Sequence, residues 1–115
     1  MTREVGMGGS DLFTGTLDVL ILRAVAAGPL HGYAIGRKLR DRSEGVLSVE
    51  EGALYPALHR LEGQGLLEAS WGPSETGRRA KFYRLTKAGE RHLEQRIRRW
   101  RELSGAVDAL LAEEA

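Results

Sequence analysis

Three cations follow a short polar segment that has the composition of a turn. From Gly72 the chain has the sequence G-P-S-E-T-G, and Arg78, Arg79 and Lys81 come directly after its second glycine. Three positive charges within four positions repel one another unless anions lie near. Phosphates of a nucleic acid would relieve that repulsion, so the spacing predicts that at least one of the three contacts phosphate or a minor groove.

A short helix with an apolar stripe precedes these cations. Leu54, Leu58 and Leu61 recur at helical spacing, and glycine follows at Gly63. Tyr55 lies beside the stripe, on a neighbouring face of the predicted helix. Two roles are open for its ring, which either contacts DNA or packs under the hairpin that follows.

Two further polar residues belong to the same region. Arg60 lies about one turn beyond Tyr55 and precedes Glu62 closely, so it contacts DNA or forms an intrahelical or intersubunit salt bridge. Ser48 comes shortly before the helix, in the place of a cap or a donor to phosphate rather than of a base reader. Pro56 is tolerated only if the helix starts close to Gly52, unless the helix begins earlier and is kinked.

The elements before this helix follow from periodicity. Apolar residues over 17–25 repeat at helical spacing, with Thr14 or Thr16 as the cap, and Gly28-Pro29 ends that first helix. A second short helix follows. Its predicted apolar side holds three residues: Tyr33, Ile35 and Leu39. Two helices joined by a tight Gly-Pro turn are typical of the first half of a helix-turn-helix.

Residues 46–49 form a brief extended stretch, and the third helix is predicted to start near Glu50 or Glu51. Strands are predicted over 66–71 and 79–85, joined by the Gly/Pro/Arg loop. A helix, a strand, a basic loop and a second strand in direct succession indicate the DNA-reading end of a winged helix-turn-helix.

The last predicted helix carries an apolar seam that is longer than so small a domain can cover. Thr86 caps the helix, and large apolar residues then recur at spacings of three and four. The residues predicted to form a homodimer interface are Leu93, Ile97, Trp100, Val107 and Leu111. Trp100 lies in the middle of the seam, where it is either a packing anchor or one wall of an effector pocket at the twofold axis.

Charge and composition restrict the function further. The net charge is +1, which argues against a purely electrostatic coat on DNA, but residues 78–101 hold ten Lys and Arg against two Glu. This segregation suits a face turned to phosphates, although a solvated helix face with i,i+4 pairs is the alternative. The chain has no cysteine and three dispersed histidines. We therefore expect no metal site, no cofactor and no catalysis, and a cytoplasmic protein without a membrane span.

Three segments in unbroken order resemble the PadR family of bacterial transcription regulators. They are G-T-L-D-V-L-I-L with G-P-L-H-G-Y-A-I over 15–35, A-L-Y-P-A-L-H-R-L-E-G-Q-G-L-L over 53–67, and W-G with G-R-R-A-K-F-Y-R-L-T-K-A-G over 71–89. The second and third segments together are specific, and either alone would be weaker. The chain departs from the family pattern in its Gly/Met leader and in Ala80.

The resemblance implies the short-tailed PadR type. Family members are usually repressors that leave DNA when a small molecule or a stress signal reaches the dimer. In drug-responsive members a tryptophan at the place matching Trp100 stacks planar ligands. The partners implied are therefore a double-stranded DNA operator, a second copy of the chain and a small aromatic effector.

The fold class expected is mainly α with a small β-hairpin, a winged helix-turn-helix plus a long C-terminal dimerisation helix. The length allows one domain. We expect a disordered leader over 1–11, the winged helix-turn-helix over 12–86 and the dimerisation helix over 87–115. Two other functions are weighed against a DNA-binding repressor. A winged-helix module that binds protein instead of DNA is disfavoured by the basic loop, and a metal sensor by the dispersed histidines.

Overall fold

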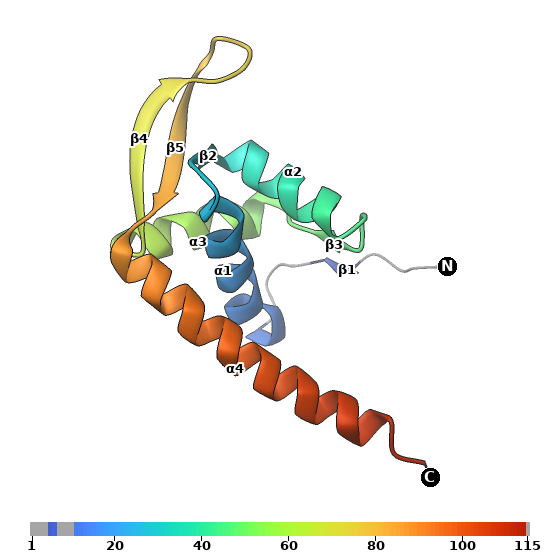
Figure 1. The fold of residues 1–115 in the computed structure, drawn as a ribbon. Coiled ribbons are helices and arrows are strands. Elements are labelled where there is room, and N and C mark those ends of the chain that lie inside the picture. The colour runs from blue at the N-terminus through green and yellow to red at the C-terminus, as the bar shows by residue number, and fades with distance from the viewer. Residues whose placement is uncertain (1–4, 7–10, 115) are drawn as a thin grey trace.

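Three helices form the body, from which a β-hairpin and a long C-terminal helix project (Figure 1). The two hairpin strands and one short strand make a three-stranded antiparallel sheet. The computed structural model describes residues 5–6 and 11–114. Within these residues the elements, in chain order, are β1 (Val5–Gly6), α1 (Asp11–Val25), β2 (Leu30–His31), α2 (Gly32–Arg42), β3 (Leu47–Ser48), α3 (Glu51–Gly63), β4 (Leu67–Pro73), β5 (Arg79–Leu85) and α4 (Lys87–Leu111). This arrangement confirms the predicted fold class.

The core lies where α1, α2 and α3 meet the base of the hairpin. Its fully buried side chains include Ile21 and Leu22 of α1, Ile35 of α2, and Leu58 and Leu61 of α3. Burying each such side chain stabilises the fold by about 1.5–3 kcal/mol. Leu54 is buried as well, which confirms the predicted stripe of α3.

Helix α3 starts at Glu51, which confirms the predicted start near Glu50 or Glu51. Pro56 is the sixth helical residue and cannot donate a hydrogen bond to the carbonyl of Gly52. The buried leucines of the same helix offset that loss, because they hold α3 against the core whatever the local propensity.

Several local predictions are wrong. Helix α1 starts at Asp11, so Thr14 and Thr16 lie inside it and neither caps it. Tyr33 is 67% exposed and does not belong to the apolar side of α2. Strand β2 was not predicted, because its two residues gain their extended pairing from β5, at Leu30↔Tyr83 and His31↔Phe82.

The leader predicted to be disordered over 1–11 is described only at Val5, Gly6 and Asp11. Val5 and Gly6 form a parallel pair with Leu47 and Ser48 of β3, and Asp11 belongs to α1. The rest of that predicted leader lies outside the described residues. In the hairpin, β4 starts one residue later and ends two residues later than predicted, over Leu67–Pro73.

The first turns of helix α4 pack against the body, and its later turns project away from it. The hydroxyl of Thr86 accepts a hydrogen bond from the Gly89 amide at 2.9 Å, as predicted for the cap. A Cβ atom at Gly89 would lie 2.2 Å from the Leu66 carbonyl oxygen, so only glycine allows this close approach. Further along α4, Arg96 donates to the Gly15 carbonyl at 3.2 Å, and no described part of the body covers the last turns (Figure 1).

Candidate nucleic-acid interface

The β4–β5 hairpin, which we call the wing, presents its cations by the geometry of its turn. Gly77 has φ of +83°, a conformation that favours glycine, and the Ser74 amide donates to the Arg78 carbonyl at 2.8 Å. The strand register then pairs Arg79 with Pro73 and Lys81 with Trp71. Because side chains alternate along a strand, Arg79, Lys81 and Trp71 share one face of the wing.

The three predicted cations differ in how they are neutralised. Lys81 donates a hydrogen bond to the Glu62 carboxylate of α3 at 3.1 Å, and this bond raises the pKa of the Lys81 ammonium. Arg79 has its guanidinium carbon 5.0 Å from the centre of the Trp71 ring. Among the described residues, no carboxylate forms an ion pair with Arg78 or Arg79. These two are therefore the wing cations available to an outside anion.

Tyr55 is held on the surface of α3 by a glycine of α2. Its ring is 45% exposed and lies across Gly32, where an added Cβ atom would come within 2.8 Å of the ring. The absence of a side chain at Gly32 thus lets the tyrosine ring approach the start of α2 closely. Tyr55 lines clefts on both of its sides, one toward α2 and one toward the wing.

The cleft between α2 and α3 has a volume of about 400 Å³ and opens at the start of α3. Ser48 lines it, beside the first helical residue, Glu51. Two residues that were not predicted, Tyr33 and Arg37, lie on its α2 side, with the Arg37 guanidinium carbon 5.9 Å from the centre of the Tyr33 ring. A helix N-terminus with a hydroxyl and an arginine beside it suits a phosphate group. The exposed polar face of α2 is the sequence signal that indicates Arg37.

The cleft between the wing and the helices is larger, at about 690 Å³. The aromatic and basic residues that line it include Tyr33, Tyr55, Trp71, Arg78, Arg79 and Lys81. Exposed aromatic rings interleaved with cations are typical of surfaces that bind nucleic acid. The structure therefore brings four of the six predicted DNA-binding residues to this cleft, and Ser48 to its neighbour.

Arg60 is the predicted residue that the structure places elsewhere. Its guanidinium forms an ion pair with Asp18 of α1, and it lines neither cleft. The pair joins two helices of one chain, so it is neither the intrahelical nor the intersubunit salt bridge considered from the sequence.

His31 has a structural role that the sequence did not reveal. Its Nδ1 atom accepts a hydrogen bond from the Ala34 amide at 3.1 Å and so caps α2. Its Nε2 atom lies 3.3 Å from a carboxylate oxygen of Glu75 in the wing turn, and the ring packs edge-on against Phe82 at 5.4 Å. Since Nδ1 accepts, Nε2 carries the proton and donates to Glu75. His31 thereby links the start of α2 to the wing turn.

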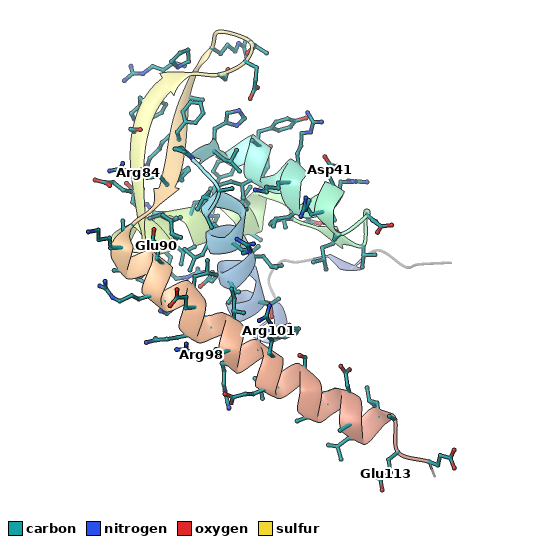
Figure 2. All side chains as sticks on the ribbon, in the orientation of Figure 1. Asp41, Arg84, Glu90, Arg98, Arg101 and Glu113 are labelled. Carbon is teal, nitrogen blue, oxygen red and sulfur yellow. The ribbon has the colours of Figure 1, made fainter. Side chains whose placement is uncertain are left out.

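The Lys and Arg residues of 78–101 do not all lie on the face of the molecule that carries the wing. Figure 2 shows Arg98 and Arg101 on α4, well away from the wing. In the part of the chain that the structure describes, no group of three or more His, Asp or Glu side chains is placed to hold a metal ion. No helix among those residues has the length and apolar character to cross a membrane.

Comparison with known proteins adds to this geometry. Residues 21–95 match the family model described as the transcriptional regulator PadR-like family. The chain belongs to the PadR-like family. A relative from Lysinibacillus sphaericus, described only as an uncharacterized protein, is 30% identical over 89% of this chain and 94% of its own. A Mycobacterium tuberculosis protein described as a transcriptional regulator is 37% identical over 76% of this chain and 78% of its own.

Solved structures agree with this family. A PadR-like transcriptional regulator from Bacillus cereus has a TM-score of 0.78 and 30% identity, covering 91% of this chain and all of the other. A transcriptional regulator from Clostridium thermocellum also reaches a TM-score of 0.78, with 31% identity over 90% of this chain and all of its own. This PadR-like chain is thus a DNA-binding transcriptional regulator with a winged helix.

Proposed function

We propose that this PadR-like regulator is a homodimeric repressor that leaves its operator when a small molecule or a stress signal reaches the dimer. It acts by binding rather than by catalysis, in the cytoplasm, where duplex DNA is accessible and a chain without cysteine needs no oxidising environment. Each α3 enters a major groove, and the two half-sites lie about one helical turn (~34 Å) apart.

The observation that carries the proposal is the position of Tyr55. Its ring is exposed on α3, with Arg37 and Ser48 lining one adjoining cleft and Arg78 and Arg79 lining the other. In this arrangement α3 contacts base edges while the flanking cations contact phosphates on either side. Phosphate contacts fix the position of a protein on DNA, and base contacts give it sequence preference.

Tyr55→Ala is expected to lower operator affinity more than affinity for random DNA, by roughly tenfold, since one lost base contact costs about 1–3 kcal/mol. Tyr55→Phe separates the hydroxyl from the ring. Fluorescence anisotropy with the operator and with a scrambled duplex of equal length measures both affinities. The control is Gln95→Ala, an exposed residue of α4. Equal losses on both duplexes would contradict a base-reading role for Tyr55.

A protein-interaction module without DNA binding is the competing function. The exposed apolar residues of α4 are the observation in its favour, because they need a partner. A second copy of the chain meets that need equally well. Arg78 and Arg79, which form no ion pair with a carboxylate in the described part of the chain, favour the DNA-binding regulator over this module.

The effector is proposed to bind at Trp100. This indole is 53% exposed in the middle of the α4 seam, and a twofold axis there would bring two such rings together. Planar cationic and phenolic compounds are expected to quench its emission and to lower operator affinity, measured in a Trp71→Phe background. If no compound quenches it and crystals show the two rings packed without a cavity, Trp100 is a packing anchor and the signal enters elsewhere.

A further inference from the structure

Trp71 is a large aromatic side chain near the end of β4 that the core does not use. Trp71 is 60% exposed. Leu67 of β4 and Tyr83 of β5 lie on the same face of the hairpin, nearer its base, and both are buried. Exposing an indole forgoes most of the stabilisation that burial of a large apolar side chain contributes. Stability of the wing therefore does not account for a tryptophan at this position.

One neighbour of Trp71 on that face, Arg79, is a cation that pairs with no carboxylate among the described residues. Arg79 lies over the ring, with its guanidinium carbon 5.0 Å from the ring centre. The other two cations of β5 with long side chains are held by acids, Lys81 by Glu62 and Arg84 by Glu68. A guanidinium that stacks through its flat face keeps the N–H groups at its edge free for an anion.

The pair faces the space that DNA is proposed to occupy. Trp71 and Arg79 both line the 690 Å³ cleft whose opposite side includes Tyr55 of α3. A free arginine at the end of a hairpin samples many rotamers, and ordering it on binding costs conformational entropy. A ring that already holds the guanidinium removes part of that cost before DNA arrives.

We propose that Trp71 is a positioning residue for DNA binding, which holds the Arg79 guanidinium ready to meet a phosphate or a minor-groove edge. The proposal rests on the proposed contact between the wing and DNA. It assigns Trp71 no base contact of its own. The indole acts only through Arg79, and this dependence distinguishes it from a tryptophan that stabilises the wing or touches DNA directly.

A double-mutant cycle on the full chain tests this dependence. Trp71→Ala is expected to weaken operator binding about fivefold, equivalent to roughly 1 kcal/mol. It leaves the salt slope unchanged, because the arginine charge is still present. Arg79→Ala weakens binding and lowers the slope by about 0.9. In the Arg79→Ala background, adding Trp71→Ala changes the affinity less than twofold.

Two conservative variants complete the test. Trp71→Phe keeps a flat ring and is expected to restore most of the affinity. Arg79→Lys keeps the charge and the slope but loses the planar guanidinium, so its affinity is expected to depend less on residue 71. The emission of Trp71, taken as the difference between the parent and Trp71→Phe, changes when operator is added to the parent.

The outcomes separate this proposal from the one on which it rests. If Arg79→Ala binds operator as the parent does, Arg79 does not contact DNA and the role of Trp71 fails, whereas the wing contact as a whole fails only if Arg78→Ala with Arg79→Ala also binds as the parent does. If Arg79→Ala weakens binding while Trp71→Ala has no effect, or if the two losses add, the wing contact stands and the positioning role is overturned. A loss for Trp71→Phe as large as that for Trp71→Ala also overturns it.

Discussion

Replacing Arg78 and Arg79 together by alanine is expected to weaken binding to every DNA sequence and to flatten the salt slope by up to ~2 units. Each phosphate contact releases about 0.9 of a counterion, and hydrogen bonds to charged groups contribute about 1.5–3 kcal/mol each. The affinity loss is therefore at least roughly tenfold. Neither arginine has an acidic partner within the described residues, so removing both leaves no buried charge behind to destabilise the fold.

The matched control removes the same charge from another part of the molecule. Arg98 and Arg101 lie on α4 away from the wing (Figure 2), and replacing both by alanine is expected to change the slope by much less. Affinities are measured by anisotropy across a salt series that includes roughly 150–200 mM, where phosphate contacts still contribute. A wing variant that binds operator as the parent does in that range shows that the wing does not contact DNA.

Lys81 shows why the sequence could not rank the three wing cations. Its proximity to Arg78 and Arg79 in the chain predicts a shared role, but the fold brings Glu62 of α3 within 3.1 Å of its ammonium. Glu62 lies 19 residues before Lys81 in the sequence, and the two side chains meet only because the hairpin packs against α3. The same reasoning applies to Arg60, whose partner Asp18 lies on α1.

The fold itself was largely predictable, since its signals are local. The stripe of α3, the cap of α4 at Thr86 and the two strands of the wing each follow from residues near in sequence. The failures share a different cause. Strand β2 is extended because it pairs with β5, about 50 residues later in the sequence. Tyr33 is exposed because it lies on the side of α2 that does not face the core.

The residues of the candidate site were predictable where their signals are local, but the contacts between them were not. Residue types and spacing indicated Tyr55 and the wing cations. The stacking of Arg79 on Trp71 depends on the register of two strands, which periodicity alone does not give. The seat of Tyr55 on Gly32 depends on the contact between α2 and α3. These contacts decide which charges are available and which rings are fixed.

The proposed dimer seam of α4 divides into two parts. Leu93 is buried in the core of its own chain and Ile97 is partly buried against that core, so of these two predicted interface residues Leu93 leaves little, and Ile97 only part, of its side chain for a second copy. Further along, large apolar side chains are exposed: Trp100 by 53%, Leu103 by 46% and Val107 by 51%. Leu110 and Leu111 are exposed by 70% and 79%. We therefore expect the second copy to pack on the half of α4 that begins at Trp100.

Leu103→Glu with Val107→Glu is expected to convert the dimer into monomers. Burying these side chains contributes about 1.5–3 kcal/mol each before association costs, and a carboxylate in their place would be desolvated without a partner. Monomers lose the gain that comes from linking two half-sites. Operator affinity should therefore fall by roughly a hundredfold or more, while each winged helix stays folded.

Sedimentation at micromolar concentration measures the mass of the assembly, circular dichroism the helix content, and anisotropy the operator affinity. Gln95→Glu with Ala109→Glu is the matched control, because it adds two carboxylates to exposed positions of the same helix. Both positions lie far around the helix from Trp100, given a rotation of about 100° per residue. A parent protein that sediments as a stable monomer, or a seam variant that remains a dimer, would show that this half of α4 does not join two copies. Its exposed leucines would then require another partner.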